Sequence, residues 1–315
     1  MTDHELDEGV LDAGALRLVR AIAETGGITA AATALGYSQP AVSQQLRRLE
    51  TRLGVALVER VGRGVRLTEA GAVLARHAVG VATAIEAAAG ELAELRGLRS
   101  GRVRLVGFPS ASPTVIPRVL ADLAARHPGV TVTYVEAEPP EAVQAVREDR
   151  ADIALTFSYP GDPGDPHGRS AHGLAVGEVG TDRLLAVVPA AHPLAGRREV
   201  RLAQLAHESW IAGCPRCRGH LLEACGRAGF APRIAFETDN VVAVEALVAR
   251  GIGVATLPRM AVEAFPMLPG VATVELGVDE ARTLHVVTAH EADRVPAVRA
   301  ALDAVSRAVT DAGRG

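Results

Sequence analysis

The sequence predicts an α/β protein in three consecutive parts. Two short helices with a tight turn occupy residues 29–49, a helical pattern without proline runs over 69–98, and strands alternate with helices from 102 onward. Alternating strands and helices favour a parallel sheet covered by helices. With 315 residues, 48% of them hydrophobic, the chain can form two or three domains with substantial cores. We therefore expect domains at 11–68, 69–98 and 102–315.

Three helices are predicted in the first domain, the first over residues 11–24. We expect the second to begin at Thr29, whose hydroxyl can accept hydrogen bonds from first-turn amides. It should end at Gly36, because glycine readily adopts the left-handed conformation that closes helices. Ser38 can then cap the third helix, with Pro40 in its first turn, where backbone amides need no partner. The second and third helices thus form a hairpin with a tight turn.

The third helix has one apolar and one polar face. Its apolar residues Val42, Leu46 and Leu49 can pack on the preceding helix, which on its own describes an ordinary helical hairpin. The polar face carries no carboxylate before Glu50, whereas a merely solvated helix usually mixes acidic with basic residues. Its amide, hydroxyl and guanidinium groups are those that read DNA bases, so we predict a helix-turn-helix with the recognition helix second. The residues predicted to meet the major groove are Ser38, Gln39, Pro40, Ser43, Gln44 and Arg47.

A short hairpin is predicted over Leu57–Thr68, where two apolar runs flank a Gly-Arg-Gly turn. Residues 10–66 hold eight Arg against four acidic residues, although the net charge of the whole chain is -4. A basic module in an acidic chain suits contact with a polyanion. We therefore predict a wing beside the recognition helix, with Thr29, Arg63 and Arg66 on the phosphates of double-stranded DNA.

At these residues the sequence resembles the LysR-type transcriptional regulators of bacteria. The resemblance runs from about Leu16 to the C-terminus. It is carried by TAAATALGYSQPAVSQQLRRLETRLGVALVER, by the wing ending GVRLTEAG and by a later GIGVATLP. It implies a winged helix-turn-helix followed by a two-lobed α/β effector-binding domain that resembles periplasmic binding proteins. The family's effectors are mostly small metabolites, often anionic or aromatic, and RNA polymerase is an implied partner.

The helical pattern over 69–98 carries a heptad seam behind Thr68, a possible N-cap. A helix this long exceeds what one small domain covers, so we predict that it pairs with a second copy of the chain. The alternative is a helix packed only on its own domain. In the resembled family this helix pairs two subunits, and the dimers often assemble into tetramers, which implies a homodimer or homotetramer. The seam residues are Leu74, Ala78, Val81, Ile85, Ala88, Leu92 and Leu95.

Beyond residue 102, strands and helices alternate at ordinary lengths. The resemblance divides this region into lobe I, about 102–160 and 268–315, and lobe II, about 165–265, joined by two crossing strands. A segment rich in Gly, Pro, Asp and His at 158–173 is predicted to be a crossover or exposed loop. The predicted strands are 103–106, 130–135, 153–156, 184–188, 210–212, 234–236, 253–257 and 283–288, and the predicted helices are 114–127, 141–147, 219–228, 241–249 and 295–312.

The cleft between the two lobes is the predicted effector site, because ligands of such sheets bind at strand carboxyl ends near helix N-termini. Ser110 and Ser112 follow the first strand and open a helix, where amides and hydroxyls can hold an anion. Thr238 and Asp239 are expected to cap another helix. Each residue alone could be a structural cap, and it is the set that indicates a pocket. The predicted effector-binding residues are Ser110, Ala111, Ser112, Thr156, Phe157, Gly213, Cys214, Thr238 and Asp239.

Three cysteines and a histidine form the pattern C-x2-C-x2-H-x4-C at Cys214, Cys217, His220 and Cys225. Zinc accepts such ligands, but structural zinc sites usually space two pairs farther apart. A Cys-x-x-Cys in a reducing cytosol tends to be catalytic, redox-sensing or metal-binding. Three interpretations stay open: reduced thiols that merely lie near the pocket, a redox sensor, and a metal site. No cofactor is predicted.

Several protein classes are disfavoured by what the sequence lacks. It contains no GxSxG, P-loop, HExxH or strand-following GxGxxG motif, so no enzymatic activity is predicted. The N-terminus MTDHELDEGV has no apolar segment behind a basic start, so we expect no signal peptide, and no window is expected to span a bilayer. We therefore predict a cytoplasmic transcription regulator without a membrane partner. The alternative is a two-lobed solute-binding protein, or a redox or metal sensor that uses its cysteines, with a helical appendage.

Overall fold

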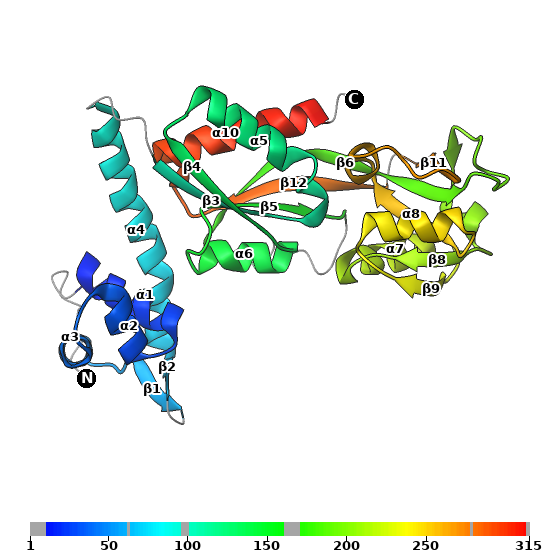
Figure 1. Cartoon of the computed structure of the whole chain (residues 1–315). Coiled ribbons are helices and arrows are strands. Elements are labelled where there is room, and N and C mark those ends of the chain that lie inside the picture. The colour runs from blue at the N-terminus through cyan, green and yellow to red at the C-terminus, as the bar shows by residue number, and fades with distance from the viewer. Residues whose placement is uncertain (1–10, 62–63, 96–100, 161–170, 278–279, 313–315) are drawn as a thin grey trace.

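The structure is a computed structural model that describes residues 11–61, 64–95, 101–160, 171–277 and 280–312. Figure 1 shows a small helical domain, one long helix and an elongated α/β domain with two lobes, in that order along the chain. The predicted fold class is therefore confirmed.

Two helices open the first domain. Helix α1 (Ala13–Thr25) is capped by the side chain of Asp12. Helix α2 (Ile28–Leu35) begins after Gly27, and no side chain caps it. The expectation that Thr29 caps α2 is wrong, because Thr29 lies inside the first turn and is exposed. Glycine is well tolerated as an N-cap, so this helix starts without a hydroxyl.

Helix α3 (Gln39–Leu53) begins as predicted. The hydroxyl of Ser38 accepts a hydrogen bond from a first-turn amide at 3.4 Å, and Pro40 occupies the first turn. Gly36 ends α2 in the left-handed conformation, with a φ of 72°. The apolar face of α3 is buried in the core of the domain, as predicted, through Val42, Leu46 and Leu49.

The predicted hairpin consists of β1 (Val58–Val61) and β2 (Gly64–Leu67), paired antiparallel. Glu50 connects the base of this hairpin to α3, a role that was not predicted for it. One carboxylate oxygen of Glu50 accepts from the amides of Leu57 at 2.8 Å and Val58 at 3.3 Å. This pair of bonds fixes where the wing stands relative to the recognition helix.

The long helix α4 (Glu69–Leu95) starts where the sequence predicts. The hydroxyl of Thr68 accepts from the Gly71 amide at 3.1 Å, so Thr68 is its cap. The N-terminal half of α4 packs on α1, which accounts for the partial burial of the early seam residue Leu74. The later seam residues Ile85 and Leu92 are 54% and 62% exposed. Packing on its own domain therefore explains only half of the seam.

The expectation that no segment is long and apolar enough to span a bilayer is wrong for helix α4. Over Glu69–Ala93 its length and mean hydropathy of 1.3 suffice for a membrane span, the one such helix within the described residues. The reason is its many alanine and valine residues, which raise the mean hydropathy without forming a continuous apolar surface. Because α4 also packs on α1 and on lobe I, its composition is weak evidence for a membrane.

Helix α4 lies very close to the backbone of the first domain at Gly71. A Cβ atom there would lie 2.1 Å from the carbonyl oxygen of Leu57, whereas one at Gly80 would meet nothing within 4 Å. We expect Gly71→Ala to destabilise the domain by about 1–3 kcal/mol through this overlap. Gly80→Ala, in the same helix, should instead stabilise it by about 0.5–1 kcal/mol. Thermal unfolding followed by circular dichroism measures both, and equal shifts for the two variants would contradict the close approach.

Lobe I has helices on both faces of its sheet, with α5 and α10 on one side and α6 on the other (Figure 1). Strands β4, β3 and β5 run parallel, whereas β12 runs antiparallel to β5 and β6. The sheet is therefore mixed rather than parallel, because β12 enters lobe I from lobe II, opposite to the direction of β5. The elements of lobe I are β3 (Gly101–Gly107), α5 (Val115–Arg126), β4 (Val130–Glu136), α6 (Pro139–Arg147), β5 (Ile153–Ser158), β12 (Ala281–Thr288) and α10 (Pro296–Ala312).

Lobe II continues the same sheet in the order β6, β10, β8, β9, with β11 also paired to β6 and β7 to β11. Its elements are β7 (Glu199–Val200), β8 (Ser209–Ala212), α7 (Pro215–Arg227), β9 (Arg233–Glu237), α8 (Val241–Ala249), β10 (Val254–Pro258), α9 (Arg259–Glu263) and β11 (Val271–Leu276). Most of the loop predicted at 158–173 lies outside the described residues.

Strand β6 (Ala175–Pro189) runs through both lobes. Its first half pairs with β12 in lobe I, and its second half pairs with β10 and β11 in lobe II. The boundaries expected at 165 and 268 therefore differ from the structure: residues 175–183 lie in the sheet of lobe I, and β11 lies in lobe II. One hydrophobic core extends through both lobes and includes Phe108, Phe157 and Trp210.

Candidate DNA-binding surface and interlobe cavity

The outward face of α3 carries the residues predicted to meet the major groove. Ser43 is half-buried and accepts a hydrogen bond from the Gln39 amide nitrogen at 2.9 Å. This bond holds two of the polar side chains side by side on the first two turns. The exposed members of the set are Ser38, Gln39, Pro40, Gln44 and Arg47.

Basic side chains gather next to this face. A surface hollow of about 810 Å³ lies between α1 and α3 and is lined by guanidinium groups and by Gln44. Guanidinium groups are suited to phosphate oxygens, because they donate several hydrogen bonds in a fixed plane. The arginines that line the hollow are Arg17, Arg47, Arg48 and Arg52.

The three predicted phosphate contacts have different surroundings. Thr29 is exposed at the start of α2. Arg66 donates to Glu59, its partner across the hairpin, at 3.0 and 2.6 Å, and both side chains are exposed. A phosphate would therefore compete with Glu59 for this guanidinium, and an exposed pair of this kind is weak enough to exchange. Arg63 lies outside the described residues.

A cavity of about 460 Å³ lies between the lobes and is lined by residues from both. Phe108, Glu138 and Tyr159 contribute from lobe I, while Cys217 and His220 contribute from lobe II. Six of the nine predicted effector-binding residues line it: Ser110, Phe157, Gly213, Cys214, Thr238 and Asp239.

The other three predicted residues lie outside the cavity lining. Ala111 is fully buried in the core of lobe I. Ser112 instead bonds the Tyr134 hydroxyl at 2.8 Å and a carboxylate oxygen of Glu136 at 2.6 Å. Thr156 is buried in β5, where successive side chains point to opposite faces, so its neighbour Phe157 reaches the cavity and Thr156 does not.

The start of α8 also differs from the expectation. Asn240 is the N-cap, and its side chain accepts from the Ala243 amide at 3.2 Å. Thr238 accepts from the Asn240 amide at 3.2 Å, so it supports the capping residue instead of capping the helix. Thr238 and Asp239 thus precede the capped turn and line the cavity, because Asn240 already satisfies the first-turn amide.

Arg282 lines the cavity at the junction of the lobes and is 2% exposed. It donates to Asp182, on the adjacent β6, at 3.0 and 2.8 Å, and to the Ser110 hydroxyl at 2.7 Å. Its guanidinium lies 4.8 Å from the ring centre of Phe108 and 4.6 Å from that of Phe157. Sequence reasoning missed this group, since only the pairing of β6 with β12 brings the two charges together.

Glu138 lies at the start of α6 and lines the same cavity. Burial raises the pKa of this carboxyl to about 7, and the negative charge of Cys217 adds to the effect. One of its oxygen atoms has no hydrogen-bond partner among the described residues. The cavity therefore contains a carboxyl group that changes its charge near neutral pH.

The structure places two of the three thiols together. The Sγ atoms of Cys214 and Cys217 lie 3.1 Å apart at the N-terminus of α7. Cys225 is buried in the core further along the helix, and His220 is paired with Glu280 at 3.0 Å. No group of three or more His, Cys, Asp and Glu side chains that could hold a metal ion occurs in the described part of the chain.

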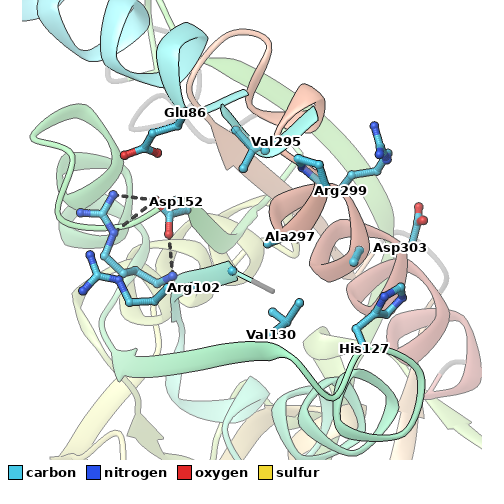
Figure 2. A pocket seen from close by; sticks show the side chains of 14 residues that line it. Glu86, Arg102, His127, Val130, Asp152, Val295, Ala297, Arg299 and Asp303 are labelled. Carbon is cyan, nitrogen blue, oxygen red and sulfur yellow. Dashed lines mark hydrogen bonds and ion pairs between the residues drawn. The ribbon is translucent and has the colours of Figure 1, made fainter. Parts of the chain in front are cut away.

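A second hollow, of about 630 Å³, lies where α4 meets lobe I. Figure 2 shows it with Glu86 and Asp152 on one side and Arg299 and Asp303 of α10 on the other. It is larger than the interlobe cavity, but no predicted site residue lines it. It instead marks the junction between the DNA-binding and regulatory domains.

Ion pairs cross this junction. Arg104 of β3 donates to Asp152 and to Asp149, in each case at 2.5 Å, and Asp149 also pairs with Arg20 of α1. These half-buried charges hold the first domain against lobe I within one chain.

Comparisons with known proteins agree with this architecture. Residues 14–72 match a family described as bacterial regulatory helix-turn-helix protein, lysR family. Residues 96–310 match a family described as LysR substrate binding domain. Together the two matches cover the winged helix-turn-helix and both lobes.

Three similar proteins represent the matches. The chain is 32% identical over 290 residues to the probable HTH-type transcriptional regulator LrrA of Synechococcus elongatus, with 91% of this chain and 94% of that protein covered. It is 36% identical over 255 residues to a probable hydrogen peroxide-inducible genes activator of Mycobacterium avium, with 78% of each covered. A solved OxyR mutant from Corynebacterium glutamicum has a TM-score of 0.60 at 26% identity, with 96% of this chain and 92% of that chain covered.

These matches extend over nearly the whole chain and agree with the order of the two domains. The chain therefore has a DNA-binding domain of the helix-turn-helix type and a regulatory domain built to bind an effector. Proteins of this kind are transcription regulators rather than enzymes. The chain belongs to the LysR family of bacterial transcription regulators.

Proposed function

We propose that this regulator is a cytoplasmic homo-oligomer that binds operator DNA through α3 and the wing and responds to a small molecule in the interlobe cavity. The observation that carries the proposal is the cavity of about 460 Å³ with walls from both lobes. A ligand held between two lobes favours whichever lobe arrangement gives it more contacts, and so shifts the population between arrangements. No catalytic role is proposed.

The exposed part of α4 supports a homodimer as the DNA-binding unit. Two subunits paired through Ile85 and Leu92 would present two copies of α3, as a two-half-site operator requires. A homotetramer of two such dimers would let a change between the lobes alter the angle between the DNA-binding domains, and hence the bend of the DNA. RNA polymerase is the proposed partner for activation.

The lining of the cavity suits a small effector with an aromatic or acidic group. Phe108, Phe157 and Tyr159 offer aromatic surface, and the first turns of α7 and α8 begin at the wall. Backbone amides at helix N-termini favour carboxylates and other anions. Arg282 is less suited to this role, because Asp182 already neutralises it.

A footprint on the DNA upstream of the chain's own gene tests the DNA-binding part of the proposal. We expect protection over two half-sites and binding that weakens steeply as salt is raised, since several phosphates are neutralised. No protection together with a flat salt dependence would contradict it. For the effector part, a metabolite that binds the lobes but leaves affinity, bending and footprint unchanged would count against the mechanism.

Two substitutions should separate base reading from phosphate binding. Gln44→Ala removes an exposed amide from α3 and should cost about 1–3 kcal/mol at one base pair of the operator, with little effect on other sequences. Arg63→Ala removes a wing charge and should weaken all sequences alike and lower the salt slope by about one. Titrations of operator and scrambled DNA at several salt concentrations measure both. Equal losses on every sequence for both variants would refute this division of roles.

A further inference from the structure

Cys214 and Cys217 are placed so that they can form a disulfide. Their Sγ atoms are 3.1 Å apart, and the Cys214 sulfur also accepts from the Cys217 amide at 3.5 Å as the N-cap of α7. A disulfide requires a separation of about 2.05 Å, so the sulfurs need to approach by only about 1 Å. Both residues line the interlobe cavity, through which a small molecule can reach them.

Cys217 is the more nucleophilic of the two thiols. The Cys214 thiol donates to its sulfur, and so does the Tyr159 hydroxyl, at 3.5 Å. These hydrogen bonds, with the nearby charges of Arg282 and His220, lower the pKa of Cys217 to about 6 in spite of its burial. The same contact with Cys217, together with burial, raises the pKa of Cys214 above its usual range. At neutral pH the pair therefore holds one proton, on Cys214.

The thiol pair is connected to the opposite lobe. Tyr159 follows β5 of lobe I, and its ring stacks on His220 of α7 at 3.9 Å between centres. The hydroxyl of Tyr159 keeps its proton, because burial raises its pKa well above the usual value. The Tyr159 hydroxyl of lobe I thus donates a hydrogen bond to the Cys217 thiolate of lobe II. The charge on Cys217 therefore affects the contact between the lobes.

Cys225 has the opposite character and serves as an internal reference. It is fully buried among apolar residues of the core, and it does not line the cavity. Burial raises the pKa of its thiol to about 12, with the charge of Glu280 as a second cause. Thiolates rather than thiols react with oxidants and alkylating agents, so Cys225 should remain inert.

We propose that Cys214 and Cys217 form a reversible redox site that reacts with small hydroperoxides and, through the lobes, alters DNA binding. The Cys217 thiolate attacks one peroxide oxygen, an S–O bond forms, the O–O bond breaks, and the departing hydroxide or alkoxide takes a proton from water. Cys214 then attacks the sulfenic sulfur, the S–S bond forms, and the hydroxyl leaves as water with the Cys214 proton. A dithiol reductant reverses the reaction by thiol–disulfide exchange, with return of two electrons and two protons.

Disulfide formation changes the cavity in two ways. It removes the negative charge of Cys217, and it removes the acceptor to which Tyr159 donates across the lobes. A metal site is less consistent with this geometry, because His220 is engaged with Glu280 and Cys225 points into the core. The regulatory part of the inference depends on the proposed function, whereas the chemistry at the thiols does not.

The thiol chemistry is tested by treating the reduced full-length chain with hydrogen peroxide, alkylating it with iodoacetamide and measuring the mass of each cysteine peptide. We expect two of the three thiols to be lost and recovered with dithiothreitol, and Cys225→Ser to lose both of its thiols in the same way. Cys214→Ser should stop at a sulfenic acid on Cys217, trapped by dimedone, and Cys217→Ser should leave Cys214 reduced. Three thiols that stay alkylatable, equal oxidation of Cys225, or a metal ion retained in native mass spectra would each overturn the site.

The pH dependence of alkylation tests the assignment of the nucleophile. In Cys225→Ser, the rate at Cys217 should rise through a midpoint near pH 6, since the thiolate forms as pH exceeds its pKa. Tyr159→Phe and Cys214→Ala each remove a donor and should move this midpoint towards the ordinary cysteine range of about 8.5. A midpoint near 8.5 in Cys225→Ser itself would overturn the assignment.

Footprints of the reduced and oxidised protein separate the two proposals. A footprint that differs between the two forms in Cys225→Ser, but not in Cys217→Ser, would support redox regulation. An unchanged footprint after proven disulfide formation would overturn the regulatory link and leave the proposed DNA binding intact. Absence of a footprint in the reduced form would instead contradict the proposed function, whatever the thiols do.

Discussion

Arg282→Met should destabilise the regulatory domain by about 3–5 kcal/mol, because it leaves the carboxylate of Asp182 buried without its countercharge. Asp182 is 5% exposed, and among the described residues its carboxylate would keep only the bond from the Met260 amide, at 3.1 Å. Methionine fills much of the same volume, so the loss reflects the charge rather than a cavity. Urea unfolding of the full chain, followed by the fluorescence of its one tryptophan in lobe II, measures the effect.

Two controls make this result specific to the buried pair. Arg150→Met breaks an exposed pair with Glu148 in the same domain and should cost less than about 1 kcal/mol. Asp182→Leu added to Arg282→Met removes both charges and should recover most of the stability. If Arg282→Met were no more harmful than Arg150→Met, the pair would not hold the lobe junction together.

The joint substitution Ile85→Asp with Leu92→Asp should abolish self-association at micromolar concentration. Both side chains are more than half exposed in the single chain, and both fall on one face of α4. A carboxylate buried without a partner at this interface costs several kcal/mol, and an interface between identical subunits carries each substitution twice. We expect at least about 4 kcal/mol, roughly a thousandfold in the dissociation constant, as measured by sedimentation equilibrium.

The matched control for the dimer is Ala84→Asp. This substitution places one carboxylate at an exposed position about 100° around the helix from Ile85, at the edge of the seam, so it should weaken the association far less than the double substitution. Operator binding should fall together with dimerisation in the double variant, because each half-site alone is bound weakly. Dimers that survive the double substitution would show that another surface joins the subunits.

Local signals sufficed for the turn between α2 and α3. Gly36, Ser38 and Pro40 each act within one helical turn, so the end of α2 and the start of α3 could be predicted from neighbouring residues. The cap of α2 could not, because Thr29 and Gly27 are both acceptable there and the tertiary fold decides between them.

One crossing strand, β12, was predicted at 283–288, but the first half of the other, β6, lay beyond such reasoning. The first half of β6, AVGEVGTDR, has two glycines and three charged residues, and it is a strand only because β12 pairs with it. The two residues of β7 and the short α9 carry no usable pattern of their own.

The cavity was predicted more completely than its chemistry. Six of the residues predicted from strand ends and helix starts line the cavity, since those positions follow from the strand order along the chain. Asp182 and Arg282, a hundred residues apart, meet only through sheet pairing, so this charge pair at the lobe junction could not be predicted from local patterns. The proximity of Cys214 and Cys217 could be expected from their spacing, whereas the hydrogen bond from Tyr159 could not.

The unbroken path of β6 through both lobes limits how the regulatory domain can move. A domain joined by loops can swing open freely, but here the hydrogen-bond ladders with β12 and β10 meet on one strand. Lobe II can turn only if this strand twists, and the irregular pairing between Leu284 and His285 is the place where the ladder is already weakened. We therefore expect any rotation of lobe II that follows ligand binding or oxidation at the cavity to be small, because it has to twist a strand that is paired in both lobes.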